Sequence, residues 1–151
     1  MIFKNDFQCK ENSEYHIPFG NITKDHYRAE AKFSENTDFE LATIVLTGGK
    51  RRVRIRFPFS HCYQIIDRNL ASVLWDIPAN LSKDVEYPLY RIGNSFLIEQ
   101  IVHRAGGVLA KEELEHYRIL TKNLLIDIIL YEGQSREIQI EEVVKNEVGQ
   151  D

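Results

Sequence analysis

The sequence predicts a single α+β domain, residues 1–151, built on a curved antiparallel β-sheet meander of roughly six to eight strands with two or three short helices. Three observations predict it. The chain of 151 residues suits one domain. Several segments alternate between apolar and polar residues and are joined by hairpin-length turns. Two strongly apolar segments, residues 116–120 and 124–130, flank the polar connection 121–123 and must be buried.

A meander is predicted early in the chain. Residues 27–33 alternate apolar and charged side chains, which is typical of a strand with one wet face. Residues 39–46 form a second strand rich in β-branched residues. The Gly48-Gly49 pair then predicts a tight hairpin. The return strand, 51–59, has inward-facing residues Val53, Ile55 and Phe57 and outward-facing residues Arg52, Arg54 and Arg56.

The middle of the chain predicts shorter elements. Residues 61–68 suit a fourth strand, and 69–76 a short helix with Asn69 as its N-cap. Residues 88–92 resemble another strand. Ser95 is expected to cap a helix over 96–104, which Gly106 and Gly107 end.

The two ends of the chain are expected to be irregular. Residues 1–26 are polar and turn-rich, with room for one short strand. A turn at 132–134 precedes a last edge strand near Ile138 and Ile140. The acidic residues 141–151 are expected to form a frayed tail.

Composition favours a cytoplasmic protein without cofactors. No signal peptide or membrane span is apparent in the sequence. Cys9 and Cys62 belong to no Cys-x-x-Cys motif, and we interpret both as reduced thiols, with one disulfide as the alternative. Of the net charge of −4, residues 1–75 contribute +2 and residues 76–151 contribute −6. An acidic second half disfavours nucleic acid and suits a basic partner, although a solvated acidic face explains it equally well.

The residues that could perform chemistry have simpler structural explanations. The ladder Arg52, Arg54 and Arg56 could grip an acidic partner or a phosphate backbone, or form a solvated face balanced by Glu30 or Glu40. No histidine pairs with another at helical metal-ligand spacing, so no metal site is predicted.

Two polar residues of the apolar C-terminal segments are candidates for a functional role. His116 is most simply a partly buried histidine that holds a turn. Asp127 interrupts an apolar strand and must find a hydrogen-bond partner, with a catalytic carboxylate of shifted pKa as the minority interpretation.

Several short motifs stand in a fixed order along residues 51–140. They are Tyr63-x-x-x-Asp67, Leu74-Trp75, Ile92-x-Asn94-Ser95-x-Leu97, Gly106-Gly107, His116-Tyr117-Arg118-Ile119-x-Thr121-x-Asn123 and Ile126-Asp127-Ile128-Ile129. In this order the chain resembles a group of small bacterial proteins, some assigned as immunity proteins of polymorphic or contact-dependent growth-inhibition toxin systems. The resemblance implies a non-enzymatic inhibitor of a cognate toxin domain. It carries over no catalytic or toxin-contacting residue.

A partner footprint is expected on the acidic second half, because a basic nuclease toxin would be steered to it. Tyr87 and Tyr90 could anchor such an interface, or belong to the core. The candidate acidic residues are Asp84, Glu86, Glu112, Glu113, Glu115 and Glu132. The alternatives are a scaffold that uses the arginine ladder and an enzyme of unrecognised type. The oligomeric state is open.

Overall fold

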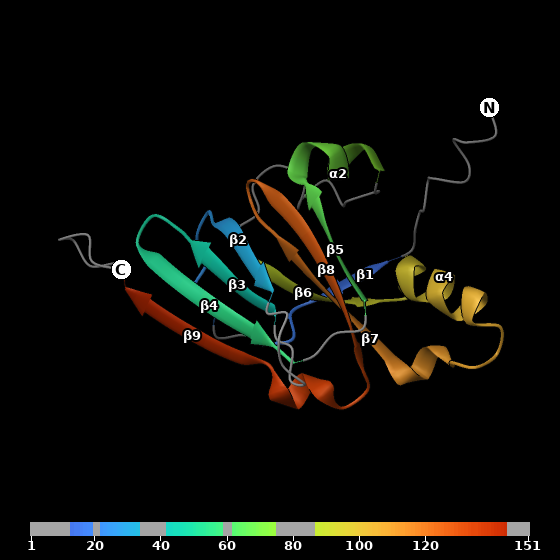
Figure 1. The fold of residues 1–151 in the computed structure, drawn as a ribbon. Coiled ribbons are helices and arrows are strands. Elements are labelled where there is room, and N and C mark those ends of the chain that lie inside the picture. The colour runs from blue at the N-terminus through green and yellow to red at the C-terminus, as the bar shows by residue number, and fades with distance from the viewer. Residues whose placement is uncertain (1–12, 20–21, 34–41, 59–61, 75–86, 145–151) are drawn as a thin grey trace.

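Two antiparallel sheets, accompanied by α-helices, make up most of the described structure (Figure 1). The computed structural model describes residues 13–19, 22–33, 42–58, 62–74 and 87–144. Nine strands and two α-helices lie within these ranges. The α+β class with antiparallel sheets is confirmed. A single curved sheet of six to eight strands was wrong, since the strands divide between two sheets.

The first sheet contains the predicted meander. Its strand order is β2-β3-β4-β9, and every pairing in it is antiparallel. The strands are β2 (Arg28–Phe33), β3 (Ala42–Thr47), β4 (Arg51–Phe57) and β9 (Gln139–Val144). The predicted alternation along β4 is confirmed, because Val53, Ile55 and Phe57 are fully buried while Arg54 and Arg56 are exposed.

β9 corrects the expected frayed tail. Residues 141–144 continue the strand that begins at Gln139, with Ile140 opposite Ile55 and Glu141 opposite Arg54. The carboxylate of Glu141 lies 2.7 Å from Arg54 Nη1. Pairing with β4 gives the acidic segment backbone and charge partners that its composition did not reveal. Residues 145–151 lie outside the described ranges.

The second sheet has five strands in the order β1-β6-β7-β8-β5. They are β1 (Glu14–His16), β6 (Leu89–Gly93), β7 (Leu114–Leu120), β8 (Leu124–Tyr131) and β5 (Cys62–Asp67). The expected fourth strand of the meander is therefore β5, which crosses to the other sheet and pairs with β8. Alternation predicts a strand, but it does not specify the strand's neighbours.

The main core lies between the two sheets. β7 contributes Tyr117 and Ile119, β8 contributes Ile126 and Ile128, and all four are at most 2% exposed. They join the inward residues of β3 and β4 in one apolar cluster. Burying each such side chain stabilises the fold by about 1.5–3 kcal/mol before entropy is counted. This core gives the five-stranded sheet one dry face, and the polar groups described below lie on its other face.

Both described α-helices contact strands of the five-stranded sheet. α4 (Phe96–Ala105) contacts β7, and α2 (Arg68–Leu74) follows β5 directly. The Ser95 hydroxyl accepts the Ile98 N–H, and Gly106 ends α4 in the left-handed conformation at φ 63°, so both predicted ends of this helix are confirmed. The N-cap prediction for α2 was wrong by two residues, because Asp67 accepts the Asn69 and Leu70 N–H groups.

The β7–β8 turn connects the two sheets. Lys122 N–H donates to the carbonyl of Tyr27 at 2.9 Å. The Asn123 side chain accepts the Ala29 N–H at 2.8 Å and donates to the Ala29 carbonyl at 3.0 Å. One amide therefore satisfies both backbone groups of a buried residue at the start of β2.

We expect Asn123→Ala to lower the free energy of unfolding by about 1–3 kcal/mol, because it leaves two polar backbone groups of Ala29 without these bonds. Urea denaturation followed by circular dichroism measures the change. Asn69→Ala on the exposed start of α2 is the control and should change stability far less. Equal losses in the two variants would contradict this role for Asn123.

Candidate functional site

A polar row crosses the second face of the five-stranded sheet. Strand register places Arg118 opposite Asp127, and Asp127 opposite Gln64. His116 lies two residues before Arg118 on β7 and therefore faces the same way. Buried polar side chains in strands that are otherwise apolar need hydrogen-bond partners, and here they can bond to one another. This row is where chemistry would be sought first.

Asp127 is the centre of the row. Its side chain is fully buried and accepts from three residues. His116 Nε2 lies 2.6 Å and Arg118 Nε 2.7 Å from Oδ1. Oδ2 accepts from Gln64 Nε2 at 2.8 Å and from Arg118 Nη2 at 3.3 Å. Both carboxylate oxygens are thus occupied by donors, which confirms the predicted structural hydrogen bond.

His116 links the carboxylate to helix α4. Its ring is 1% exposed, with Nδ1 2.7 Å from Ser95 Oγ. Because Nε2 donates to Asp127, Nδ1 of the neutral ring accepts the Ser95 hydroxyl proton. Ser95 Oγ in turn accepts the Ile98 N–H. The prediction of a partly buried histidine at a turn was wrong, since His116 is fully buried within β7.

The charges in the cluster balance one another. Burial lowers the pKa of His116 and Arg118 opposes its protonation, so the ring stays neutral despite the nearby Asp127. Burial alone would raise the pKa of Asp127, but Arg118 and His116 hold it well below its usual range. One cation and one anion therefore occupy the site, which avoids an uncompensated buried charge.

Arg118 extends the network to the edge of the sheet. Its side chain is almost fully buried, and Nη1 donates to Tyr15 Oη at 2.7 Å. The guanidinium carbon lies 5.8 Å from the centre of the Tyr15 ring, within cation–π range. Burial works against the charged form, but Asp127 and Tyr15 raise the pKa of Arg118 above its usual value. The network thus joins β1, β5, β7, β8 and α4.

A serine, a histidine and an aspartate in one hydrogen-bonded chain suggest nucleophilic catalysis. Here the serine bonds to Nδ1 and the aspartate to Nε2. Ser95 is 6% exposed, and its oxygen caps α4. A nucleophile must reach its substrate, and this hydroxyl faces the interior. We interpret the cluster as a structural network that fixes α4 on the sheet.

Of the four acidic candidates in the described residues, three are exposed and one is mostly buried. Glu112 and Glu113 are exposed in the 3₁₀ turn Lys111–Glu113, and Glu132 is exposed after β8. The Glu132 N–H donates to the Glu113 carbonyl at 2.8 Å, so the two residues are neighbours. The Glu115 side chain is mostly buried, with 12% exposed, and its Oε2 lies 3.8 Å from Arg91 Nη2. Asp84 and Glu86 lie outside the described residues.

The tyrosine candidates belong to the core. Tyr87 and Tyr90 are each 6% exposed, and their rings meet edge to face at 5.9 Å. Tyr90 also contacts Tyr15, with ring centres 5.4 Å apart. An anchor residue must offer surface to a partner. The interface interpretation of Tyr87 and Tyr90 was wrong in the described structure, and the core alternative holds.

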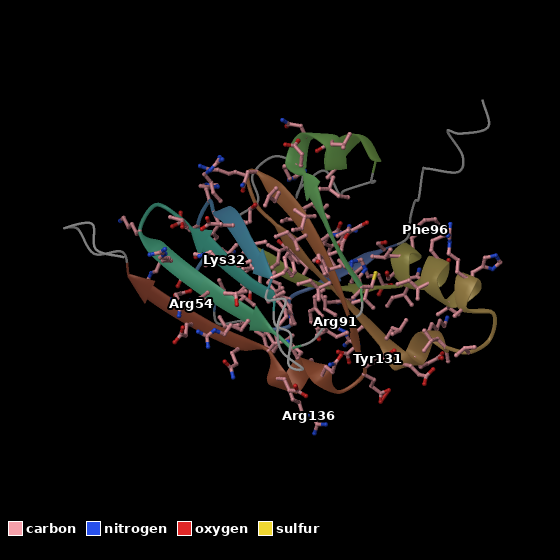
Figure 2. The ribbon with its side chains drawn as sticks, in the orientation of Figure 1. Lys32, Arg54, Arg91, Phe96, Tyr131 and Arg136 are labelled. Atoms are coloured by element: carbon pink, nitrogen blue, oxygen red, sulfur yellow. The ribbon has the colours of Figure 1, made fainter. Side chains whose placement is uncertain are left out.

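The arginine ladder lies on the exposed face of the four-stranded sheet, where Figure 2 shows Arg54 and Lys32. Arg54 pairs with Glu141, and Arg51 lies 3.5 Å from Glu142. The partial balance of charge therefore comes from β9. Glu30 faces Val45 across the sheet, and Glu40 lies outside the described residues.

The apolar end of the five-stranded sheet, under α4, contains a pocket of about 120 Å³. The sequence did not indicate it, because its walls come from segments that are distant along the chain. The lining residues are Cys62, Ile101, Leu109, Leu114, Ile129, Leu130 and Tyr131. Burial raises the pKa of the Cys62 thiol, which favours its neutral form. Cys9 lies outside the described residues.

The fold and the buried network define the chain as a small antiparallel α+β domain with a satisfied polar core. Comparison with protein-family models, curated proteins and solved structures finds no match. Neither described helix has the length and apolar character needed to cross a membrane. In the described ranges, no group of three His, Cys, Asp or Glu residues is placed to hold a metal ion.

Proposed function

We propose that the chain is a non-enzymatic immunity protein that binds and neutralises a cognate bacterial toxin domain in the cytoplasm. The resemblance over residues 51–140 motivates the proposal. One observation carries the proposal: the side chains that could perform chemistry are buried and hydrogen-bonded to one another. They are Ser95, His116, Arg118 and Asp127. A protein that acts by binding needs a surface, and this network supplies a rigid support for one.

The described surface offers a region suited to a basic partner. Glu112, Glu113 and Glu132 gather where β7 begins and β8 ends. Carboxylates at this position would steer a toxin domain with a basic cleft and compete with its nucleic-acid substrate. The inhibition would be stoichiometric, through an interface of roughly 1,600 Å² in total.

The two alternatives have less support. A scaffold that binds an acidic partner or nucleic acid would use Arg52, Arg54 and Arg56, but Arg54 already pairs with Glu141. An enzyme that used Ser95, His116 or Asp127 would need access to side chains that are at most 6% exposed, so the core would have to open before a reaction at those groups.

The test is protection from the toxin. The chain is co-expressed with the toxin domain encoded immediately upstream of its gene, and growth is scored. We expect rescue, together with a one-to-one complex on a sizing column when a catalytically dead toxin domain is used. A toxin domain from an unrelated locus is the control and should not be neutralised. Failure of rescue with the cognate domain would contradict the proposal.

A further inference from the structure

The pocket beneath α4 is open to the surface, and its shape suits a single side chain. About 120 Å³ is slightly less than the roughly 150 Å³ of engineered apolar cavities that bind benzene. Its walls come from α4, from the segment after it and from the ends of β5, β7 and β8. Neighbouring apolar residues Ile98, Leu97 and Val102 complete the cluster under the helix.

Two exposed apolar residues either line the pocket or adjoin a lining residue along the chain. Val108, next to the lining residue Leu109, is 81% exposed. Tyr131, which lines the pocket at the end of β8, is 37% exposed and is labelled in Figure 2. Gly106 and Gly107 hold positive φ angles of 63° and 95° just before Val108 and so fix the course of this loop. Exposed apolar groups around a pocket are typical of a binding site.

Three exposed carboxylates lie on the segments that border the pocket. Glu113 precedes the lining residue Leu114, and Glu132 follows the lining residue Tyr131. Glu112 lies beside them in the 3₁₀ turn, which also contains Lys111. Arg104 lies in the last turn of α4, and Arg136 Nε donates to the Gly133 carbonyl, next to Glu132, at 3.3 Å. An apolar centre with a charged rim is the usual anatomy of a protein interface.

We propose that this pocket receives one apolar side chain from a basic segment of the toxin domain, with Glu112, Glu113 and Glu132 facing the Lys or Arg residues that flank it. This inference rests on the proposed immunity function and adds the place and chemistry of the contact. The inserted side chain is of leucine, methionine or phenylalanine size, because the volume admits no more. Val108 and Tyr131 pack against its flanks.

The thiol of Cys62 reports on occupancy because it lines the pocket. In a Cys9→Ser background, the rate of alkylation by iodoacetamide is measured with and without the catalytically dead toxin domain at one pH. We expect the complex to react more slowly by about tenfold or more, since the inserted side chain blocks access to the thiol. A Leu70→Cys variant in a background without the two natural cysteines is the control; its site on α2 is 51% exposed and should stay reactive.

A matched pair of variants tests the same contact through affinity. Val108→Lys and Leu70→Lys each replace an exposed apolar side chain, so neither should disturb the fold. We expect Val108→Lys to raise the Kd for the toxin domain by about tenfold or more, because it places a cation against a basic segment and removes apolar contact. Leu70→Lys should stay within about twofold.

The outcomes separate this inference from the proposed function. A complex in which Cys62 reacts as fast as in the isolated chain would overturn the inference and leave the immunity function standing. Equal Kd values for the two lysine variants would overturn it as well. Absence of any complex with the cognate toxin domain would overturn both.

Discussion

Replacement of Asp127 by asparagine is expected to lower the free energy of unfolding by about 3–5 kcal/mol, the cost of breaking a buried ion pair from one side. The amide has nearly the same shape, but it leaves the Arg118 cation without its counter-ion inside the protein. It also presents an N–H group where His116 or Gln64 now donates. Urea denaturation followed by circular dichroism measures the loss.

Two further variants make this result specific. Asp67→Asn changes an exposed aspartate of β5 that caps α2, and asparagine caps almost as well, so little change is expected. Arg118→Met combined with Asp127→Leu removes both buried charges and should recover part of the loss. If Asp127→Asn alone cost less than about 1 kcal/mol, the carboxylate would not be the centre of the network.

Acid should destabilise the protein in two stages. The pKa of His116 is lowered in the folded state, so its stabilising contribution is complete above about pH 6.5 and is lost as pH falls below that value. The pKa of Asp127 is also lowered, so its contribution is complete above about pH 4 and is lost in stronger acid. In both cases the unfolded chain binds the proton more readily than the folded protein does. The free energy of unfolding must therefore decrease as the pH decreases.

The first stage is the one to measure. Unfolding free energies between pH 7 and pH 5 should fall by up to about 1.4 kcal/mol per pH unit for one proton. His116→Gln should flatten this slope, whatever it does to stability at pH 7. His103→Gln, which changes an exposed histidine in the last turn of α4, should leave the slope intact. An unchanged slope in His116→Gln would contradict the assignment of a buried neutral ring.

The elements that local patterns determine could be predicted from the sequence. Alternation identified β2 and β4, β-branched composition identified β3, and cap chemistry identified both ends of α4. The need of Asp127 for a partner followed from its apolar surroundings. Its actual partners did not follow, because they depend on the register of β7 and β8 and on the pairing of β5 with β8. Arg118, Gln64 and Tyr15 gave no local signal of burial.

Local sequence patterns also could not predict which sheet a strand joins or which residues lie at the surface. β5 follows β4 closely along the chain, as the next strand of a meander would, yet it pairs in the other sheet. The charges of residues 141–142 suggested a solvated tail, although arginines of β4 attract them into β9. Tyr87 and Tyr90 looked equally suited to an interface and to a core. Only the packing around Tyr15 places them in the interior.

The position of β9 has a consequence for synthesis. β4 is made early, but its outer edge pairs with β9, the last of the described strands. Contacts between segments so distant along the chain form slowly. A ribosome must therefore synthesise the chain as far as residue 144 before the four-stranded sheet can be completed. Until then the unpaired edge of β4 is open to pairing with other chains, and the newly made protein is most prone to aggregation at that stage.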